Sequence, residues 1–402
     1  MTAEAYGRPL SVALNMFFLT EVSGGVGRYA REMVPALLRC EPMTRIVAFV
    51  SKDAPRDVFA QPWSQEVDWV VLPLRTTGPR GHWTAQTILQ NAWLPLIAPR
   101  RDVDVLHGLA NTVPPFVPGA ATVVTLLDVT WLHYPQTIPS RAIRVPFKAM
   151  SLLGARWADR VIAISEAARE DFVASIGLTR SKIDVAPLGI TDAATAIPTP
   201  EPTVRSRLGL DGRRIVLSVA QKNPHKNLAS LIRAIAGQEK DVVLVLPGSP
   251  TQHERELRAL ASELGVTDRV RFPGWLSEED LEGLYRAATC FVLPSFMEGF
   301  GLPILEAMRR AVPVACSNRS SLPEVAGDAA LLFDPEDQSA VTAAIGRLLN
   351  DRGLATQLAH RGRERCREFP WERTAEATLA SYRRAIVQRR TRARGHRRMR
   401  HR

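Results

Sequence analysis

The sequence lacks the features that would place it across a membrane or in an oxidising compartment. No uninterrupted apolar run reaches about 18 residues, so no transmembrane helix is predicted. The start, MTAEAYGRPLSVAL, has an acid and no basic segment before its short apolar stretch, which is not the pattern of a secretory signal. The four cysteines form no CxxC pair; they are Cys40, Cys290, Cys316 and Cys366. Neither a zinc site nor a disulfide framework is indicated, and a reducing, cytoplasmic setting is expected.

Several short catalytic motifs are missing as well. There is no HExxH, no GxSxG and no GK[ST], and no Ser/His/Asp constellation can be assembled. The triplet DVD at 102–104 has the form of a metal-binding DxD. This triplet starts a predicted strand, however. Asp102 and Asp104 should then point to one face of the strand and Val103 to the other, as in an ordinary strand start. The DxD form is therefore discounted as a metal site.

The net charge of +11 is concentrated at the C-terminal end. From Arg383 to Arg402 there are ten arginines and no acid, which leaves about +1 for the rest of the chain. The basicity therefore says little about the folded part, and nucleic acid is not the expected partner. After Gln388 there are eight arginines and no packing pattern, so residues 389–402 are expected to be disordered. Their charge suggests peripheral contact with an anionic membrane from the cytoplasmic side.

The rest of the chain alternates short apolar strands with amphipathic helices, in two series. Its length of 402 residues suits two domains of roughly 200 residues. The first series begins with a strand, SVALNMFF (11–18), and a helix in which Tyr29, Met33 and Leu37 recur at helical spacing. A Pro-rich linker, residues 191–204, separates the two series.

Strands rich in Val, Ile and Leu that alternate with helices indicate parallel sheets covered on both faces. The sequence therefore predicts an α/β protein with two doubly wound domains, residues 1–190 and 205–370, facing a cleft. One of the predicted helices is SEAAREDFVASIG (165–177), in which Ser165 is the N-cap candidate and Gly177 ends the helix. In such sheets ligands collect beyond the carboxyl ends of the strands, so the candidate residues are those directly after strands.

The stretch SFMEGFGLPILEAM (295–308) follows a predicted strand and forms a turn and a helix start. The helix begins at Leu302 with Pro303 in its first turn, where a missing N–H costs little. Amides at Gly301 and Leu302 would favour an anion, and glycines such as Gly299, beside Phe300, let backbone approach a ligand closely.

Two acids flank this turn. Glu298 at its mouth and Glu306 inside the helix can accept hydrogen bonds from ligand hydroxyls. Amides for phosphate and carboxylates for hydroxyls together describe a nucleotide sugar. The alternative is a helix whose acids only complement its dipole.

A second loop after a predicted strand is SVAQKNPHKN (218–227). Lys226, with Lys222 or His225 nearby, can neutralise a diphosphate. The alternative is a solvated loop.

The segment EVSGGVGRYARE (21–32) is a glycine-rich turn before the first helix. It matches only the loose G-x-G-x-x-A form of the dinucleotide-binding pattern. Gly24, Gly25 and Gly27 can bring amides to a phosphate, and a plain tight turn into a helix is about equally compatible.

The segment VTLLDVTWLHYP (124–135) leaves Asp128 at a strand end, followed by Trp131, His133 and Tyr134. An acid, a histidine and aromatics at the edge of a cleft suit a polyol acceptor. The alternative is an Asp that caps the next turn. His107, which lies at the end of another predicted strand, is interpreted as structural rather than catalytic.

Around EGFGLPILEAM the chain resembles the retaining glycosyltransferases of family 4, which have the two-domain GT-B fold. Their Glu-x7-Glu pattern is matched by Glu298 and Glu306. NPHKN resembles their donor loop, SGGVGRYARE their N-terminal glycine loop, and SNRSSLPEVAGDAALLFDPED the segment after the two acids. Residues 371–388 resemble their last helix, which crosses back to the first domain. The resemblance covers roughly residues 10–388 and is most specific over 291–335.

The resemblance implies a nucleotide-diphosphate sugar as donor, bound mainly by the second domain, and transfer with retention at the anomeric carbon. It also implies that no metal is needed, because basic side chains and amides carry the leaving diphosphate. By analogy, Glu298 holds sugar hydroxyls, Glu306 the ribose and Lys226 the diphosphate, and Gly25 approaches from the other domain. Residues expected in catalysis are Glu298, Asp128 and Lys226. Residues expected at the donor are Gly24, Gly25, Gln221, Lys222, Lys226, Glu298, Gly299, Phe300, Gly301, Leu302 and Glu306.

Two positions depart from the family pattern. Gln221 stands where many relatives have an arginine a few residues before the lysine, so a neutral side chain occupies the place of a second diphosphate cation. Leu127 stands where many have a histidine directly before the acid that Asp128 matches. An apolar side chain therefore stands where the histidine of those relatives contributes to the sugar site.

The sequence thus predicts an enzyme that transfers a hexosyl unit, with mannosyl as one option, to a polyol, saccharide or lipid-linked saccharide. One alternative is a sugar–nucleotide epimerase of the same two-domain form, against which the Glu-x7-Glu pattern argues. Another is a binding protein of this fold with weakened catalysis, held to nucleic acid or anionic lipid by its arginine tail. The acceptor cannot be identified from segments such as 75–100.

Overall fold

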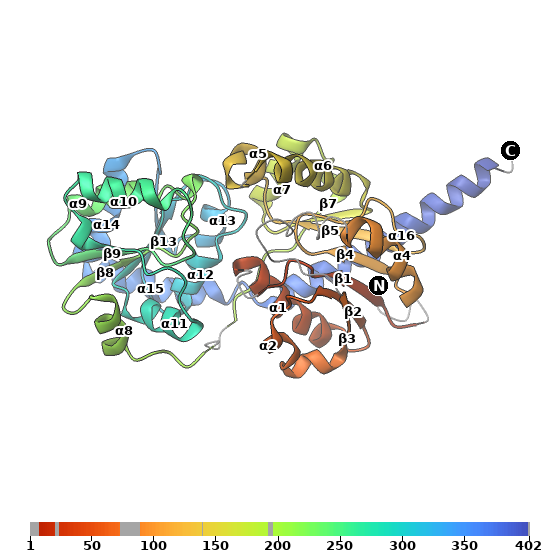
Figure 1. The fold of residues 1–402 in the computed structure, drawn as a ribbon, viewed down its shortest axis with the longest axis horizontal. Coiled ribbons are helices and arrows are strands. Elements are labelled where there is room, and N and C mark those ends of the chain that lie inside the picture. Colours follow the sequence, from red (N-terminus) through yellow and green to blue (C-terminus); the bar gives the residue numbers. More distant parts are fainter. Residues whose placement is uncertain (1–7, 21–23, 73–88, 139, 192–195, 401–402) are drawn as a thin grey trace. The chain divides into compact units, whose positions relative to one another are not determined.

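The computed structural model describes residues 8–20, 24–72, 89–138, 140–191 and 196–400 (Figure 1). The chain divides into two compact units. Unit 1 comprises Met1–Gly189 and Trp371–Arg402, and unit 2 comprises Ile190–Pro370. The chain therefore leaves unit 1 after Gly189 and returns to it at Trp371.

Unit 1 is built on a parallel sheet whose described strands have the order β3-β2-β1-β4-β5-β6-β7. These strands are β1 (Ser11–Asn15), β2 (Arg45–Ser51), β3 (Val67–Leu72), β4 (Val105–Gly108), β5 (Ala121–Leu126), β6 (Arg160–Ala163) and β7 (Ile183–Val185). In the register of the sheet, Val12 of β1 lies between Ile46 of β2 and Val105 of β4. Every residue of β1, β4 and β5 is buried, as expected for apolar strands covered on both faces.

The helices of unit 1 are α1 (Gly24–Cys40), α2 (Arg56–Phe59), α4 (Leu94–Ile97), α5 (Thr130–His133), α6 (Arg141–Trp157), α7 (Glu166–Ile176) and α16 (Trp371–Arg400). Short single-turn helices are η2 (Pro62–Glu66), η3 (Leu89–Trp93), η4 (Ala98–Arg101), η5 (Pro135–Thr137) and η6 (Arg180–Lys182). The helical spacing recognised in α1 is confirmed, because Tyr29, Met33 and Leu37 are all buried. The ends of α7 are confirmed too. Ser165 accepts a hydrogen bond from the Ala168 amide, and Gly177 takes the left-handed conformation at φ 69°.

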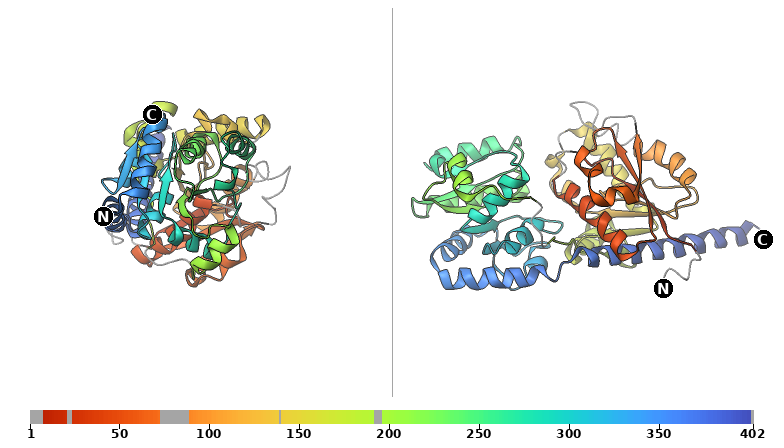
Figure 2. Two further views of the ribbon diagram at one scale, coloured as in Figure 1. Left: turned by 90° about the vertical axis from the view of Figure 1, so that its left-hand side faces the viewer. Right: turned by 90° about the horizontal axis from the view of Figure 1, so that it is seen from below.

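The last helix, α16, packs on α1 and on the strands of unit 1 (Figure 2). Thr374 donates a hydrogen bond to the Pro187 carbonyl at 2.6 Å. Deeper in the unit, the Tyr382 hydroxyl and His107 Nδ1 are 2.8 Å apart, and His107 Nε2 lies 2.8 Å from Thr125 Oγ1. His107 is fully buried, so it has the structural role that the sequence indicated.

The C-terminal segment differs from the expectation of disorder over 389–402, because α16 continues to Arg400. Arginine favours helix, and no proline interrupts the segment. Arg389 donates to the Val117 carbonyl at 3.0 Å, and Arg392 pairs with Asp159 at 3.1 Å. These partners lie more than 200 positions away in the sequence, so composition alone did not indicate them. Within the described residues, no helix combines the length and the apolar content that crossing a bilayer requires.

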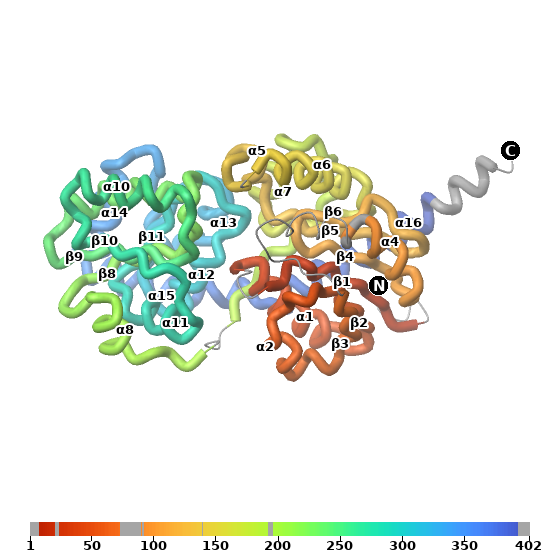
Figure 3. The backbone as a smooth tube through the Cα atoms, in the orientation of Figure 1, coloured from red at the N-terminus to blue at the C-terminus, as the bar shows by residue number. Residues whose placement is uncertain are grey.

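Unit 2 has a parallel sheet whose described strands have the order β10-β9-β8-β11-β12-β13. They are β8 (Arg214–Leu217), β9 (Val242–Val245), β10 (Val270–Arg271), β11 (Cys290–Leu293), β12 (Val314–Ser317) and β13 (Ala330–Phe333). The helices are α8 (Glu201–Leu208), α9 (Leu228–Ala236), α10 (Glu254–Glu263), α11 (Glu278–Ala287), α12 (Leu302–Arg309), α13 (Leu322–Ala326), α14 (Gln338–Asn350) and α15 (Arg352–Cys366). Single-turn helices are η7 (Pro224–Lys226) and η8 (Thr267–Arg269). Figure 3 traces this βα alternation through the unit.

The core of unit 2 joins apolar residues of its strands to α9, α10, α14 and α15, with Leu231, Leu244, Val292 and Ile345 fully buried at its centre. The segment expected as a linker over 191–204 ends differently, because α8 already begins at Glu201. Pro202 falls in the first turn of α8, where proline is tolerated because its missing N–H would have no partner there.

Candidate active site

Two loops of unit 2 meet because the strands before them are neighbours. β8 and β11 pair in parallel in the middle of the sheet. Their carboxyl ends therefore lie at the same edge. After β8 comes the loop that contains η7, and after β11 come residues 294–301 and α12. The sequence placed its principal donor candidates in these two loops.

Two serine hydroxyls hold the turn before α12 by hydrogen bonds to its backbone carbonyls. Ser320 Oγ donates to the Glu298 carbonyl at 2.7 Å, and Ser321 Oγ donates to the Glu298 and Phe300 carbonyls at 3.0 and 2.9 Å. Gly301 caps α12 at φ 104°, and a Cβ there would lie 2.7 Å from Leu322 Cδ2. Glycine is thus required for both backbone and space. The first amides of α12 have no acceptor within their own helix and are suited to an anion.

Lys226 and Glu298 form an ion pair at the mouth of this turn. Lys226 Nζ lies 2.8 Å from both carboxylate oxygens, and Ser295 Oγ donates to Glu298 Oε1 at 2.7 Å. Both side chains are largely buried, with 17% of Lys226 and 12% of Glu298 exposed. The predicted diphosphate cation and the predicted sugar-binding acid therefore neutralise each other in this structure.

Glu306 lies inside α12 and is 8% exposed. The hydroxyl of Tyr285 on α11 donates to Glu306 Oε2 at 2.8 Å. Arg310 lies over the Tyr285 ring, 4.5 Å from its centre, and also pairs with the buried Glu282. Sequence reasoning missed Tyr285, because it lies in an ordinary amphipathic helix and no motif links it to Glu306.

The loop after β8 places its polar residues differently from what was expected. Lys222 was predicted to bind the donor, but its side chain is fully buried, with Nζ donating to the Gly248 carbonyl at 2.6 Å and 3.5 Å from Glu254. Burial lowers the pKa of Lys222, and Glu254 opposes that shift. The ammonium is thus occupied by partners after β9, which the local sequence could not show. Gln221 is exposed and accepts a hydrogen bond from Asn223.

His225 lies between Lys222 and Lys226 and is buried. Its backbone carbonyl accepts a hydrogen bond from the Phe296 amide at 2.8 Å, which ties this loop to the turn after β11. Burial, and secondarily the Lys226 charge, lowers the pKa of His225 to about 3. The imidazole is therefore neutral at physiological pH and adds no second cation beside Lys226.

The remaining predicted residues belong to unit 1. Gly24, at φ 55°, and Gly25 begin α1, with no atom within 4 Å of a Cβ placed on either glycine. Asp128 follows β5, and its Oδ1 accepts a hydrogen bond from the Thr130 amide at 2.9 Å at the start of α5. That bond is the turn-capping contact considered as the alternative for Asp128. Residues 21–23 and most of 75–100, named above as candidates, lie outside the described residues.

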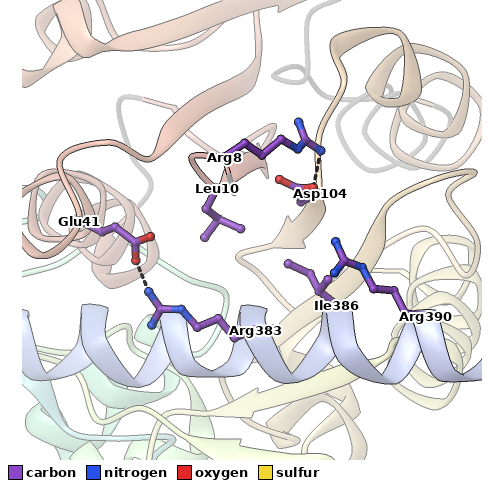
Figure 4. A pocket seen from close by; sticks show the side chains of 7 residues that line it. All are labelled: Arg8, Leu10, Glu41, Asp104, Arg383, Ile386 and Arg390. Carbon is purple, nitrogen blue, oxygen red and sulfur yellow. Dashed lines mark hydrogen bonds and ion pairs between the residues drawn. The ribbon is translucent and has the colours of Figure 1, made fainter. Parts of the chain in front are cut away.

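Unit 1 also has a small charged cavity of about 30 Å³, shown in Figure 4. It is lined by Arg8, Leu10, Glu41, Asp104, Arg383, Ile386 and Arg390. Arg8 pairs with Asp104 at 2.7 Å, and Arg383 pairs with Glu41. The first pair joins the segment before β1 to the segment before β4, and the second attaches α16 to the end of α1.

Comparisons with known proteins place the chain in a family. Residues 201–365 match the family model described as "Glycosyl transferases group 1", and residues 23–193 match "Glycosyltransferase Family 4". The O-antigen chain mannosyltransferase B of Escherichia coli is 31% identical, over 69% of this chain and 74% of that protein. The MMP alpha-(1->4)-mannosyltransferase of Mycolicibacterium hassiacum is 30% identical, over 86% of this chain and 87% of that protein.

Solved structures agree at the level of the fold. Sucrose-phosphate synthase from Thermosynechococcus elongatus has a TM-score of 0.73 at 24% identity, covering 94% of this chain and 99% of that one. HepE of Anabaena, in complex with UDP and glucose, has a TM-score of 0.72 at 19% identity, covering 92% and 100%.

Two parallel α/β units of this kind, with these relatives, define a glycosyltransferase of the GT-B fold. The chain belongs to glycosyltransferase family 4. The resemblance, the fold class and the enzyme class predicted from the sequence are confirmed.

Proposed function

We propose that the chain transfers a hexosyl unit, with mannosyl as the first choice, from a nucleotide-diphosphate sugar to a saccharide or lipid-linked acceptor, with retention at the anomeric carbon. The observation that carries this proposal is the Lys226–Glu298 pair, 2.8 Å across, at the turn that opens α12. This chain matches most of the length of two relatives that are named mannosyltransferases, and their names support the choice of mannose.

The proposed donor contacts follow from the chemistry of the described groups. Lys226 and the first amides of α12 face the diphosphate, because a cation and unpaired helix N–H groups both favour phosphate oxygens. Glu298 then accepts hydrogen bonds from hydroxyls of the sugar, and Glu306, held by Tyr285, accepts them from the ribose. Binding of the donor therefore separates Lys226 from Glu298 and gives each a ligand partner.

Transfer needs little proton chemistry from the protein. As the glycosidic bond breaks, negative charge develops on the leaving diphosphate, where Lys226 and the α12 amides stabilise it. The acceptor hydroxyl attacks from the same face, and the leaving phosphate takes its proton. Asp128 keeps a proposed role on the acceptor side, with its carboxylate oriented by the Thr130 amide. In this proposal Lys226 and the α12 amides neutralise the diphosphate, and no metal is required.

The test is release of nucleoside diphosphate from a panel of guanosine, uridine and adenosine diphosphate sugars, with a crude mixture of acceptors. The expected result is acceptor-dependent release from one mannosyl donor, undiminished by EDTA, with an α-linked product by NMR. Interconversion of free sugar nucleotides without acceptor would instead identify an epimerase. Donor binding without turnover on any acceptor would identify a binding protein.

We also propose that the basic end of the chain contacts an anionic membrane. Residues 393–402 contain five arginines and no acid, and each basic residue near such a surface contributes about 1 kcal/mol. A chain cut after Arg392 keeps the Arg389 and Arg392 contacts with unit 1. It should retain activity on soluble acceptors and bind anionic vesicles more weakly. Undiminished vesicle binding would refute this role of the end.

A further inference from the structure

The helix α6 of unit 1 has an unusual charge composition for an exposed helix (Figure 1). Its sequence, RAIRVPFKAMSLLGARW, contains four basic residues and no acidic residue. The net charge of the chain outside its C-terminal end is close to zero, so this helix is a local concentration of positive charge.

The inner face of α6 is fixed by close packing. Ser151, Gly154 and Ala155 are buried against the unit, and a Cβ on Gly154 would lie 2.8 Å from the Val113 carbonyl. Phe147 packs edge to face on Trp131, with ring centres 5.8 Å apart. Gly154 therefore lets α6 approach Val113 closely, and the face opposite these buried residues is outward.

That outward face carries an apolar stripe. Val145 is 67% exposed, Leu153 45% and Trp157 62%, and Ala149 is exposed between them. The four residues are spaced by four positions, so they follow one line along the helix. Isolated exposed apolar residues are ordinary, but a continuous row of them on one helix marks an interaction surface.

Basic side chains lie beside this stripe. Arg141 and Lys148 are exposed, and neither has an ion-pair or hydrogen-bond partner among the residues that the structure describes. At the C-terminal end of α6, Lys182 donates to the Arg156 carbonyl, and Arg392 of α16 pairs with Asp159, two residues after Trp157. The basic end of the chain thus begins next to the end of α6.

We propose that the outer face of α6 is a membrane-docking surface for anionic lipid. An apolar stripe flanked by cations suits a bilayer interface, where apolar side chains enter the acyl boundary and basic ones meet lipid phosphates. Trp157 at the end of the stripe suits the headgroup level. The two cations favour anionic lipid over an apolar protein partner. Against an apolar protein surface, Arg141 and Lys148 would lose their hydration without gaining a counter-ion. The residues of this surface belong to unit 1 and the donor residues to unit 2, and the proposal does not depend on which donor is used.

The experiment measures binding of the full chain to vesicles of phosphatidylcholine alone and with 30% phosphatidylglycerol, by flotation. The test variants are Val145→Glu with Leu153→Glu, and Arg141→Gln with Lys148→Gln. The matched control is Met43→Glu, an apolar residue of unit 1 that is 70% exposed outside α6. We expect at least tenfold weaker binding to anionic vesicles for both double variants, with unchanged Met43→Glu binding. Loss of two charges should cost about fivefold each.

Thermal unfolding and donor turnover on a soluble acceptor separate this proposal from other causes. Both should match the wild type, since the substituted side chains are exposed. Unchanged vesicle binding in both double variants would overturn the proposal, even if cutting after Arg392 abolished binding. A dimer in the wild type that becomes a monomer in the variant with Val145→Glu and Leu153→Glu, seen by sedimentation, would overturn it in favour of self-association.

Discussion

At the scale of single residues, the candidate site is a set of polar groups that pair with one another. Lys226 and Glu298 neutralise each other, and Ser295 holds one oxygen of that carboxylate. A substitution in this set changes its partners as well as the ligand contact. Removing either charged side chain leaves its partner, now 2.8 Å away, as an unpaired charge. An unpaired charge is costly for groups this buried.

Substitution of the two glutamates should therefore have different effects on affinity and turnover. Glu306→Ala should lower the affinity for the nucleoside diphosphate roughly tenfold or more, because ribose belongs to product and substrate alike. Glu298→Ala should preserve or raise that affinity, because it releases Lys226 toward the diphosphate, and should depress turnover with intact donor. Calorimetric binding of nucleoside diphosphate, alongside turnover, measures both effects.

Two further variants control this comparison. Tyr285→Phe removes the hydroxyl that donates to Glu306 but keeps the carboxylate, so it should weaken diphosphate binding less than Glu306→Ala. Glu298→Asp should not restore turnover, because losing one methylene withdraws the carboxylate by about 1.5 Å. Loss of diphosphate affinity in Glu298→Ala, with none in Glu306→Ala, would reverse the assignment.

Lys226→Ala tests the diphosphate contact. Charge-assisted hydrogen bonds contribute about 1.5–3 kcal/mol, so affinity for donor and for free nucleoside diphosphate should fall together, by roughly ten- to a hundredfold. Lys240→Ala, at an exposed lysine of the same unit, is the control and should change neither. If diphosphate affinity is untouched while turnover falls, Lys226 does not contact the diphosphate.

The sequence predicted the residues of this site that form a linear motif and missed those that meet it across space. Glu298, Gly301 and Glu306 stand in one string, so their spacing was visible. Tyr285 and Ser321 reach the same string from other elements, which single-sequence spacing does not show. For the same reason the sequence did not show the contact between Lys222 and Gly248, because Gly248 follows a different strand.

At the scale of elements, the opening of α12 depends on one glycine. Gly301→Ala forces a side chain into φ 104° and brings its Cβ to 2.7 Å from Leu322 Cδ2. Strain of this kind costs about 1–3 kcal/mol, so the unfolding free energy of unit 2 should fall by about that amount. Gly346→Ala in α14 is the control, because its Cβ would lie at 3.7 Å from Gln238 and helix propensity favours alanine. Chemical denaturation measures the unfolding free energy of both variants. If Gly301→Ala is as stable as Gly346→Ala, the turn adjusts to the added methyl group without cost.

The attachment of α16 gives a second prediction at this scale. A chain cut after Gln388 loses the Arg392 contact with Asp159, a carboxylate only 1% exposed, and should lose about 1–2 kcal/mol of unfolding free energy in unit 1. A chain cut after Arg392 should unfold like the full chain. Thermal unfolding of the two truncations, compared directly, measures the difference. If both behave alike, the Arg392–Asp159 pair does not contribute to stability.

The elements themselves were largely predictable, and the exceptions have physical causes. Apolar strands and amphipathic helices such as α1 and α7 follow from local periodicity and caps. The start of α8 within the expected linker, and the continuation of α16 beyond 388, were not predicted. Composition suggested no packing at either place, whereas α16 is held by tertiary partners such as Val117 and Asp159.

At the scale of the whole molecule, the chain is two compact units with a buried histidine in each. His107 lies in unit 1 and His225 in unit 2. A protein with two such units need not unfold in one step, so stability belongs to each unit rather than to the chain. Burial lowers the pKa of both histidines to about 3.

The sign of the pH effect follows from these pKa values. Between about pH 6.5 and 3 the unfolded chain binds a proton at each histidine that the folded units do not bind, so stability rises with pH in this window. Each histidine contributes its full stabilisation above pH 6.5, and that contribution is progressively lost as the pH falls through this window. Lowering the pH from 7.5 to 5 should cost about 2 kcal/mol per unit from these groups alone.

Single substitutions assign the effect to its unit. His107→Gln should be less stable at pH 7.5, because its contacts with Tyr382 and Thr125 change, but its unit 1 transition should fall less between pH 7.5 and 5. His225→Gln should flatten the pH dependence of unit 2 alone. Calorimetric unfolding at both pH values resolves the two transitions. The slope is diagnostic, since lost packing lowers stability equally at both pH values, whereas a lost titration changes only the difference between them. A pH dependence as steep in His107→Gln as in the wild type would mean that His107 is already protonated in the folded unit, against its burial between Tyr382 and Thr125.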